Sequence, residues 1–147
     1  LHTDWLPISL PEDILADPRV KVPVFITTCH YYLNDIYEEL GPTNFVNGSH
    51  NSGRSPNGDT EWKGGEERSI MCNAGDAIIF RSEVWHRGTA NTSDENRYLL
   101  QVHYSHRMIT QKFPPYLNKF QFDPAILSQA TARQHRLLGD HTPSNYD

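Results

Sequence analysis

The sequence has few of the features that mark membrane proteins, disulfide-rich secreted proteins or nucleic-acid-binding proteins. No apolar run approaches the ~20 residues of a transmembrane helix, so we expect no membrane-spanning segment and no membrane partner. Two cysteines, Cys29 and Cys72, are too few for a disulfide framework and indicate the reducing cytoplasm. The net charge is −5 and the arginines and lysines are scattered, which argues against nucleic acid as a partner.

What the sequence does contain is a series of short β-branched and aromatic runs separated by turn residues. With 147 residues, 37% hydrophobic and 21% charged, the chain is expected to form one globular domain, residues 1–147. A late helix is predicted with Asp123 as N-cap, Pro124 as first residue and Gly139 as stop. Many short strands with one helix indicate an all-β sandwich or barrel. The predicted strands are 1–6, 24–33, 43–46, 68–72, 77–80 and 97–106, with a helical turn at 12–16 and the least structured stretch at 50–67.

A histidine follows one apolar strand pattern, and an arginine opens the next. His86 comes after the run 77–80 and a short turn, and Arg97 stands eleven residues further on. Two antiparallel strands joined by a loop of that length can hold His86 and Arg97 side by side in one cavity. A histidine there can bind a metal, and an arginine can clamp a carboxylate with two parallel hydrogen bonds.

The remaining part of such a metal site stands at the start of the sequence, in His2-Thr3-Asp4. Residues i and i+2 of a strand point to the same face, so His2 and Asp4 can bind one ion together. With His86 they make two imidazoles and one carboxylate, the facial triad of non-haem Fe(II) oxygenases. The alternative for His2 and Asp4 is a frayed, solvated terminus, where polar residues are common.

In the order and spacing of these motifs, the sequence resembles the phytanoyl-CoA dioxygenase family of iron- and 2-oxoglutarate-dependent oxygenases. The resemblance covers nearly the whole chain, and one departure is Asn47, where relatives usually have proline. The motifs that carry it are His2-Thr3-Asp4, Glu39-Leu40-Gly41-Pro42-Thr43, Asn47-Gly48-Ser49-His50, Ala74-Gly75-Asp76 and the segment from His86 to Arg97.

The resemblance implies a double-stranded β-helix, a cupin-like jelly roll whose metal sits inside the mouth. It implies Fe(II) held by His2, Asp4 and His86, with 2-oxoglutarate as cosubstrate bound through Arg97. The small-molecule substrate and O2 would complete the reaction, which releases succinate and CO2. In relatives a core strand and several helices precede the His-x-Asp motif, and we expect this chain to lack them, as a fragment or as a reduced form.

Several assignments have a second interpretation. Arg97 can instead be a surface residue paired with Glu95 or Asp94. Relatives often add a hydroxyl contact to the cosubstrate, for which Thr43 and Thr89 are the candidates, although either can be an ordinary strand residue. For the whole protein, the alternative to a dioxygenase is a non-catalytic jelly-roll module that binds a metal or a ligand.

Overall fold

A computed structural model describes residues 1–106, 108–109 and 122–138 of the chain. The chain divides into two compact units, Leu1–His103 and Tyr104–Asp147, which are described in turn. Within the described ranges, no helix is both long enough and apolar enough to cross a membrane.

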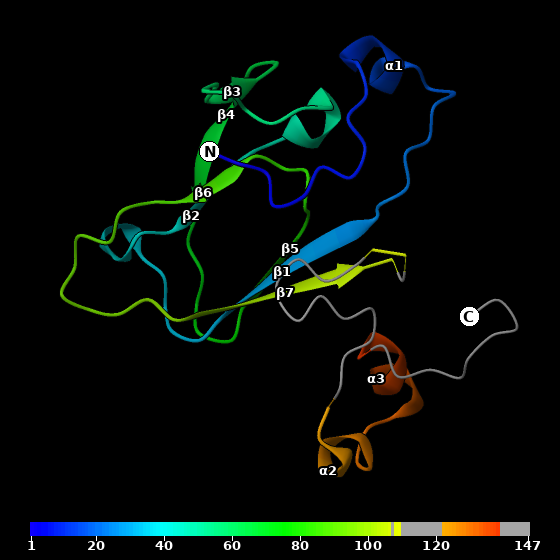
Figure 1. The fold of residues 1–147 in the computed structure, drawn as a ribbon. Helices are drawn as coiled ribbons and strands as arrows, with labels where there is room; N and C mark the ends of the chain where they lie inside the picture. The colour runs from blue at the N-terminus through cyan, green and yellow to red at the C-terminus, as the bar shows by residue number, and fades with distance from the viewer. Residues whose placement is uncertain (107, 110–121, 139–147) are drawn as a thin grey trace, which may run out of the picture. The chain divides into compact units, whose positions relative to one another are not determined.

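The first unit is built from two small sheets (Figure 1). One has the strand order β5-β1-β7 and the other the order β3-β4-β2-β6. This arrangement confirms the predicted fold class, an all-β double-stranded β-helix. The strands are β1 (Ile26–Tyr32), β2 (Thr43–Val46), β3 (Glu61–Trp62), β4 (Gly65–Ile70), β5 (Ala77–Arg81), β6 (His86–Gly88) and β7 (Leu99–Ser105), whose last two residues belong to the second unit; one α-helix, α1 (Glu12–Ala16), and two 3₁₀ turns, η1 (Glu38–Leu40) and η2 (Ser49–Ser52), complete it.

Strand β1 places one row of side chains between the two sheets. It begins at Ile26 rather than at the predicted position 24, because its partner β5 ends at Arg81, opposite Thr27. Alternate residues of a strand share a face, and the inward row is buried to at least 97% of its surface. This row consists of Ile26, Thr28, His30 and Tyr32.

Contacts between aromatic rings and one hydrogen bond join the two sheets. The ring of Phe45 on β2 lies 4.8 Å from that of Phe80 on β5, between centroids. The Tyr32 hydroxyl donates to the Thr43 hydroxyl oxygen at 3.2 Å. An apolar cluster continues from Tyr32, at the end of β1, and consists of Tyr32, Ile36, Leu40 and Cys72, with Ile78 and Leu99 packed against it.

The N-terminal segment is not the strand predicted for residues 1–6. It makes one antiparallel bridge, in which His2 and His86 exchange backbone hydrogen bonds of 2.9 and 3.0 Å. From Asp4 onward the backbone bonds to the Ser82 carbonyl instead. The prediction was wrong in extent because the partner strand β6 is only three residues long.

The stretch 50–67 is more ordered than its composition suggested. It contains most of η2, all of β3 and the start of β4. Gly53 has φ +68°, and a Cβ there would lie 1.9 Å from the Leu10 carbonyl oxygen, so this position requires glycine. Close contact with the segment before α1 therefore orders the part of this stretch around Gly53, although its composition predicted little regular structure.

The described part of the second unit contains two short helices where one was predicted. Asp123 is the N-cap, accepting from the Ala125 amide, and Pro124 begins α2 (Pro124–Leu127), as expected. The chain then starts a new helix, α3 (Ala132–Leu137), because Thr131 and Gln134 form a capping box. The predicted stop at Gly139 lies outside the described residues.

Ser49 ties the Gly48-Ser49-His50 turn to the residue that precedes β6. Its hydroxyl donates to the Val46 carbonyl at 2.7 Å and accepts from the Trp85 amide at 2.8 Å, and both Ser49 and Trp85 are fully buried.

We predict that Ser49→Ala lowers the free energy of unfolding by about 1–3 kcal/mol, because the Trp85 amide loses its partner inside the core. Urea denaturation measures this. Ser105→Ala, at an exposed serine at the end of β7, is the control and should change stability by less than about 0.5 kcal/mol. Equal losses in the two variants would contradict the role of Ser49.

Candidate metal site

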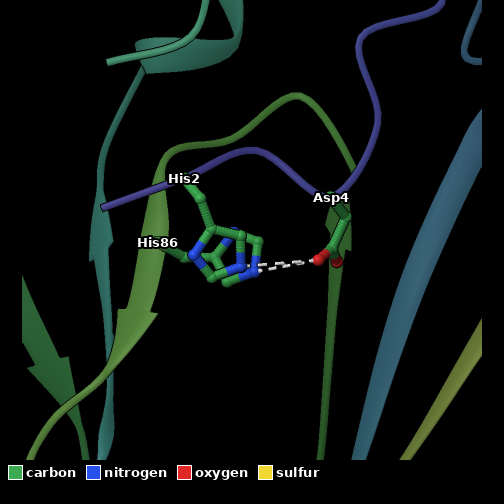
Figure 2. Close-up of side chains that lie close together, drawn as sticks. All are labelled: His2, Asp4 and His86. Atoms are coloured by element: carbon green, nitrogen blue, oxygen red, sulfur yellow. Dashed lines mark ion pairs between the residues drawn. The ribbon is translucent and has the colours of Figure 1, made fainter. Parts of the chain in front are cut away.

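Three side chains from two distant parts of the sequence meet at the bridge between the N-terminal segment and β6. An oxygen of Asp4, Oδ1, lies 3.6 Å from His2 Nε2 and 3.5 Å from His86 Nε2. The rings of His2 and His86 lie 4.4 Å apart, between centroids. Figure 2 shows both rings turned toward the same carboxylate oxygen. The three donor atoms all lie within 4.8 Å of one another, which is the spacing of a metal site.

The backbone fixes which nitrogen of His86 faces this site. His86 is the first residue of β6 and is 3% exposed. Its Nδ1 lies 2.9 Å from the Val84 carbonyl oxygen, which can only accept a hydrogen bond. Nδ1 therefore carries a proton, which leaves Nε2, on the side of Asp4 and His2, as the nitrogen that can bind a metal.

Asp4 is held by its other oxygen, Oδ2. This atom accepts hydrogen bonds from the Thr28 hydroxyl at 3.0 Å and from Gln101 Nε2 at 3.1 Å. Burial works to raise the pKa of the Asp4 carboxyl, but hydrogen bonding and positive charge from His86, with the Thr28 hydroxyl, outweigh it and lower the pKa to about 2. Asp4 is therefore ionised at neutral pH, with Oδ1 directed at the two histidines.

A short chain of hydrogen bonds supports Thr28 and Gln101 in turn. Thr28 has one hydroxyl proton, which goes to Asp4, so Ser82 Oγ at 2.7 Å and His103 Nδ1 at 3.0 Å act as its donors. His103 Nε2 is then free of a proton and accepts from Gln101 Nε2 at 3.3 Å. Sequence reasoning missed this network. Its members are separated by up to 75 residues, and only the strand pairing brings them together.

The donor set fits Fe(II). Two imidazole nitrogens and one carboxylate oxygen on one side of an ion form the 2-His-1-carboxylate triad, which leaves the other positions open for ligands. The carboxylate is supplied ionised, and the hydrogen bond from Nδ1 of His86 to Val84 leaves Nε2 as its metal-binding nitrogen. His2 contributes its side chain from the more exposed side of the site, where 57% of its surface is accessible.

Arg97 lies near this site, but it does not reach the site through the pair of antiparallel strands that the sequence predicted. Strands β6 and β7 belong to different sheets, and Arg97 precedes β7. A Cβ on Gly88 would lie 3.1 Å from a guanidinium nitrogen of Arg97, and Gly88 shares a face of β6 with His86. The guanidinium also donates to the Gly41 carbonyl oxygen.

Arg97 is half-buried, and no carboxylate of residues 1–106, 108–109 or 122–138 lies within ion-pair distance of it. Pairing with Glu95 or Asp94, the alternative drawn from the sequence, is therefore not what the structure contains. A partly buried guanidinium without a carboxylate is costly, and an anionic ligand would relieve that cost.

The two candidate threonines differ in their surroundings. Thr43 is 4% exposed, pairs with Gly88 across the β2–β6 ladder and so lies on the face where the Arg97 guanidinium packs. Thr89 is directed elsewhere, because its hydroxyl donates to the Pro42 carbonyl at 2.9 Å.

His30 stands in the same interior and was not expected to take part in the site. It is 3% exposed, and its ring packs against Phe80 at 5.0 Å and faces His86 at 6.2 Å, between centroids. Burial, and next the charge of His86, lower the pKa of His30 to about 4, so its ring is neutral at neutral pH. Neither ring nitrogen has a hydrogen-bond partner among the described residues.

The hydrogen bond from Thr28 to Asp4 yields a test of the metal site. We predict that Thr28→Val weakens divalent metal binding about tenfold or more, because partners that orient a ligand typically contribute that much. Anaerobic calorimetry with Fe(II) measures the affinity. Thr27→Val is the matched control, since Thr27 is the neighbouring residue of β1 and points to the opposite face. Unchanged affinity in Thr28→Val would show that Asp4 does not depend on this contact.

Comparisons with known proteins cover part of the chain. The sequence model of the family described as phytanoyl-CoA dioxygenase (PhyH) matches residues 2–98. No curated protein sequence matches the chain. Among solved structures, HygX from Streptomyces hygroscopicus with nickel and 2-oxoglutarate bound is 23% identical with a TM-score of 0.39, covering 52% of this chain and 34% of HygX. The same protein with iron bound gives 19% identity and a TM-score of 0.38, covering 52% and 35%. The chain thus spans about a third of the length of these solved structures. Since the family match covers well over half of its residues, the chain belongs to the phytanoyl-CoA dioxygenase family.

Proposed function

We propose that this protein is an Fe(II)- and 2-oxoglutarate-dependent dioxygenase that hydroxylates a small molecule and releases succinate and CO2. The observation that supports this most directly is the pairing of a His-Asp-His group with the half-buried guanidinium of Arg97, which has no carboxylate partner in the described structure. A metal ligand set at one end and an unpaired cation at the other suit a cosubstrate with a chelating end and a distal carboxylate.

In this proposal His2, Asp4 and His86 hold Fe(II), and Arg97 binds the distal carboxylate of 2-oxoglutarate. When bound, the iron and the cosubstrate supply the oxidising power, with O2, that the hydroxylation of a substrate needs. The protein contributes orientation: Thr28 and Gln101 fix the plane of the Asp4 carboxylate, and the Val84 carbonyl fixes the His86 ring.

Other residues of the interior would position the cosubstrate and exclude water. Thr43 is the better-placed hydroxyl for a second contact beside Arg97, and Thr89 is the alternative if its bond to Pro42 opens. Phe45 and Phe80 form an apolar wall, with ring centroids 5.7 and 4.9 Å from that of His86. An apolar wall strengthens the electrostatic contacts that it surrounds.

The setting of this activity is also a proposal. We infer a cytoplasmic protein, because Cys29 and Cys72 are both free thiols in the core and suit a reducing compartment. We retain a single domain over residues 1–147 as the working interpretation. Retention of Asp4, where halogenating relatives have a small residue, supports oxygen chemistry rather than halogenation.

The first test is turnover of the cosubstrate. With Fe(II), 2-oxoglutarate and O2, the parent should form succinate even without substrate, and a chelator should stop it. Asp4→Ala should reduce succinate formation to background and weaken Fe(II) binding at least tenfold, since it removes the only anionic ligand. Asp13→Ala, at an exposed carboxylate of α1, should behave as the parent. A parent that binds Fe(II) but forms no succinate would favour a non-catalytic jelly-roll module.

The second test concerns Arg97. A lysine cannot reproduce the paired hydrogen bonds of a guanidinium, and losing a buried charged contact typically costs about 2–5 kcal/mol, which is well over tenfold in affinity. Arg97→Lys should therefore weaken 2-oxoglutarate binding by more than tenfold and leave Fe(II) affinity unchanged. Calorimetry with each ligand separates the two effects. Arg87→Lys is the matched control, because Arg87 lies on the other face of β6 and pairs with Glu67. Equal 2-oxoglutarate affinity in parent and Arg97→Lys would remove Arg97 from the site.

A further inference from the structure

We propose that His30 contacts the cosubstrate directly, donating a hydrogen bond to the keto oxygen or a carboxylate oxygen of 2-oxoglutarate as the molecule runs from the metal ligands to Arg97. The inference rests on the proposed function and assigns a further residue to the same site.

The position of His30 along β1 is the first observation. Three inward residues of this strand follow one another at intervals of two, and each faces a different part of the site. Thr28 donates to Asp4 at the metal end, at 3.0 Å. Tyr32 donates to Thr43, at 3.2 Å, beside the face where Arg97 packs. His30 lies between them and faces His86 across the interior.

Strand β6, on the opposite side of the interior, has the same order of residues from the metal end to the Arg97 end. His86 and Gly88 share a face of β6, and the Arg97 guanidinium packs over Gly88. Successive residues on one face of a strand are about 6.6 Å apart, so the metal end and the Arg97 end are separated by roughly the length of a five-carbon diacid. A molecule that joins the two ends must pass the ring of His30.

The second observation is that both ring nitrogens of His30 are buried and without a partner among the described residues. A buried polar atom without a hydrogen bond costs about 1–3 kcal/mol, and such atoms are rare in native proteins. Packing against Phe80 does not explain a histidine here, because that contact needs only a ring. The neutral ring offers one donor and one acceptor nitrogen, and a carboxylate or keto oxygen is a suitable acceptor.

Metal binding does not explain His30 either. The group of side chains that could hold an ion consists of His2, Asp4 and His86, and within the described ranges it does not include His30. The remaining explanation is an ordered water, which would satisfy the ring without any contact to the cosubstrate. The experiment below distinguishes the two.

The test compares His30→Phe and His30→Gln with the parent. Phenylalanine keeps the ring and removes both nitrogens, whereas glutamine keeps a donor and an acceptor. Calorimetry measures 2-oxoglutarate binding with Ni(II) in place of iron, so that no turnover occurs, and thermal unfolding is followed without metal or cosubstrate. We expect His30→Phe to weaken 2-oxoglutarate binding about tenfold, with Ni(II) affinity unchanged and an unfolding midpoint equal to or above that of the parent.

The controls separate this contact from packing. His30→Gln should keep 2-oxoglutarate affinity within about threefold of the parent, because it retains a donor. Cys29→Ala, on the same strand but the other face, should lower stability without changing that affinity. Parent-like cosubstrate binding in His30→Phe would overturn the proposal and leave the water.

The remaining outcomes also test whether His30 contacts the cosubstrate. A fall in Ni(II) affinity or in unfolding midpoint that matches the loss of cosubstrate binding would assign His30 a packing role, against the proposal. If His30→Phe does not fold, His30→Leu takes its place, and failure of both would show that the nitrogens already have partners. A parent that binds Ni(II) but not 2-oxoglutarate would overturn the proposed function itself, and this contact with it.

Discussion

The site depends on one backbone interaction, the pair of hydrogen bonds between His2 and His86. This bridge holds the N-terminal segment, which has no regular structure, against β6. It brings the imidazoles of His2 and His86, which are far apart in sequence, to the same carboxylate. The next backbone bonds, from Asp4 and Trp5, go to Ser82 rather than further along β6. The segment therefore turns away from β6 just where the Asp4 carboxylate faces the Nε2 atoms of both rings. A regular strand over residues 1–6 would carry the chain past that point.

Strand alternation extends this order from the ligands to their supports. Thr28, His30 and Tyr32 project from one face of β1, and Phe45 and Thr43 project from β2 opposite His86 and Gly88. The register of β2 with β6 thus decides which residues stand beside the candidate metal site and which stand beside Arg97. A slip of β2 by one residue would turn Thr43 and Phe45 to the other face. Ser49 protects this register, because its hydroxyl bonds both the end of β2 and the amide of Trp85.

The sequence predicted those helices, strands and caps that depend on residues adjacent in the chain. The strand 43–46, the turn at 12–16 and the cap at Asp123 follow from residue types at adjacent positions, and the structure contains them. The candidate metal ligands follow from motif order, since each stands beside a recognisable neighbour, and the structure brings their three side chains together. His30, Thr28, Gln101 and His103 were not, because nothing near them in sequence distinguishes them from packed strand residues. Their roles arise only from pairing across the sheets, between residues as far apart as Asp4 and Gln101. The break between α2 and α3 was missed for a different reason: the capping box of Thr131 and Gln134 competes with continuation of the helix.

Charge balance connects the two ends of the interior. A divalent metal bound by Asp4 retains one net positive charge, since the carboxylate is ionised and the imidazoles are neutral when they bind metal. Arg97 adds a second positive charge with no carboxylate nearby in the described structure. At neutral pH 2-oxoglutarate carries two carboxylates, one for each of these charges, whereas a monoanion would leave one of them uncompensated in a partly buried space. His30 does not disturb this balance, because burial keeps its ring neutral. With the proposed ligands, the interior would match a dianion in charge as well as in the placement of its donors. In our proposal a neutral His30 donates a hydrogen bond to that dianion without adding a charge that would have to be compensated.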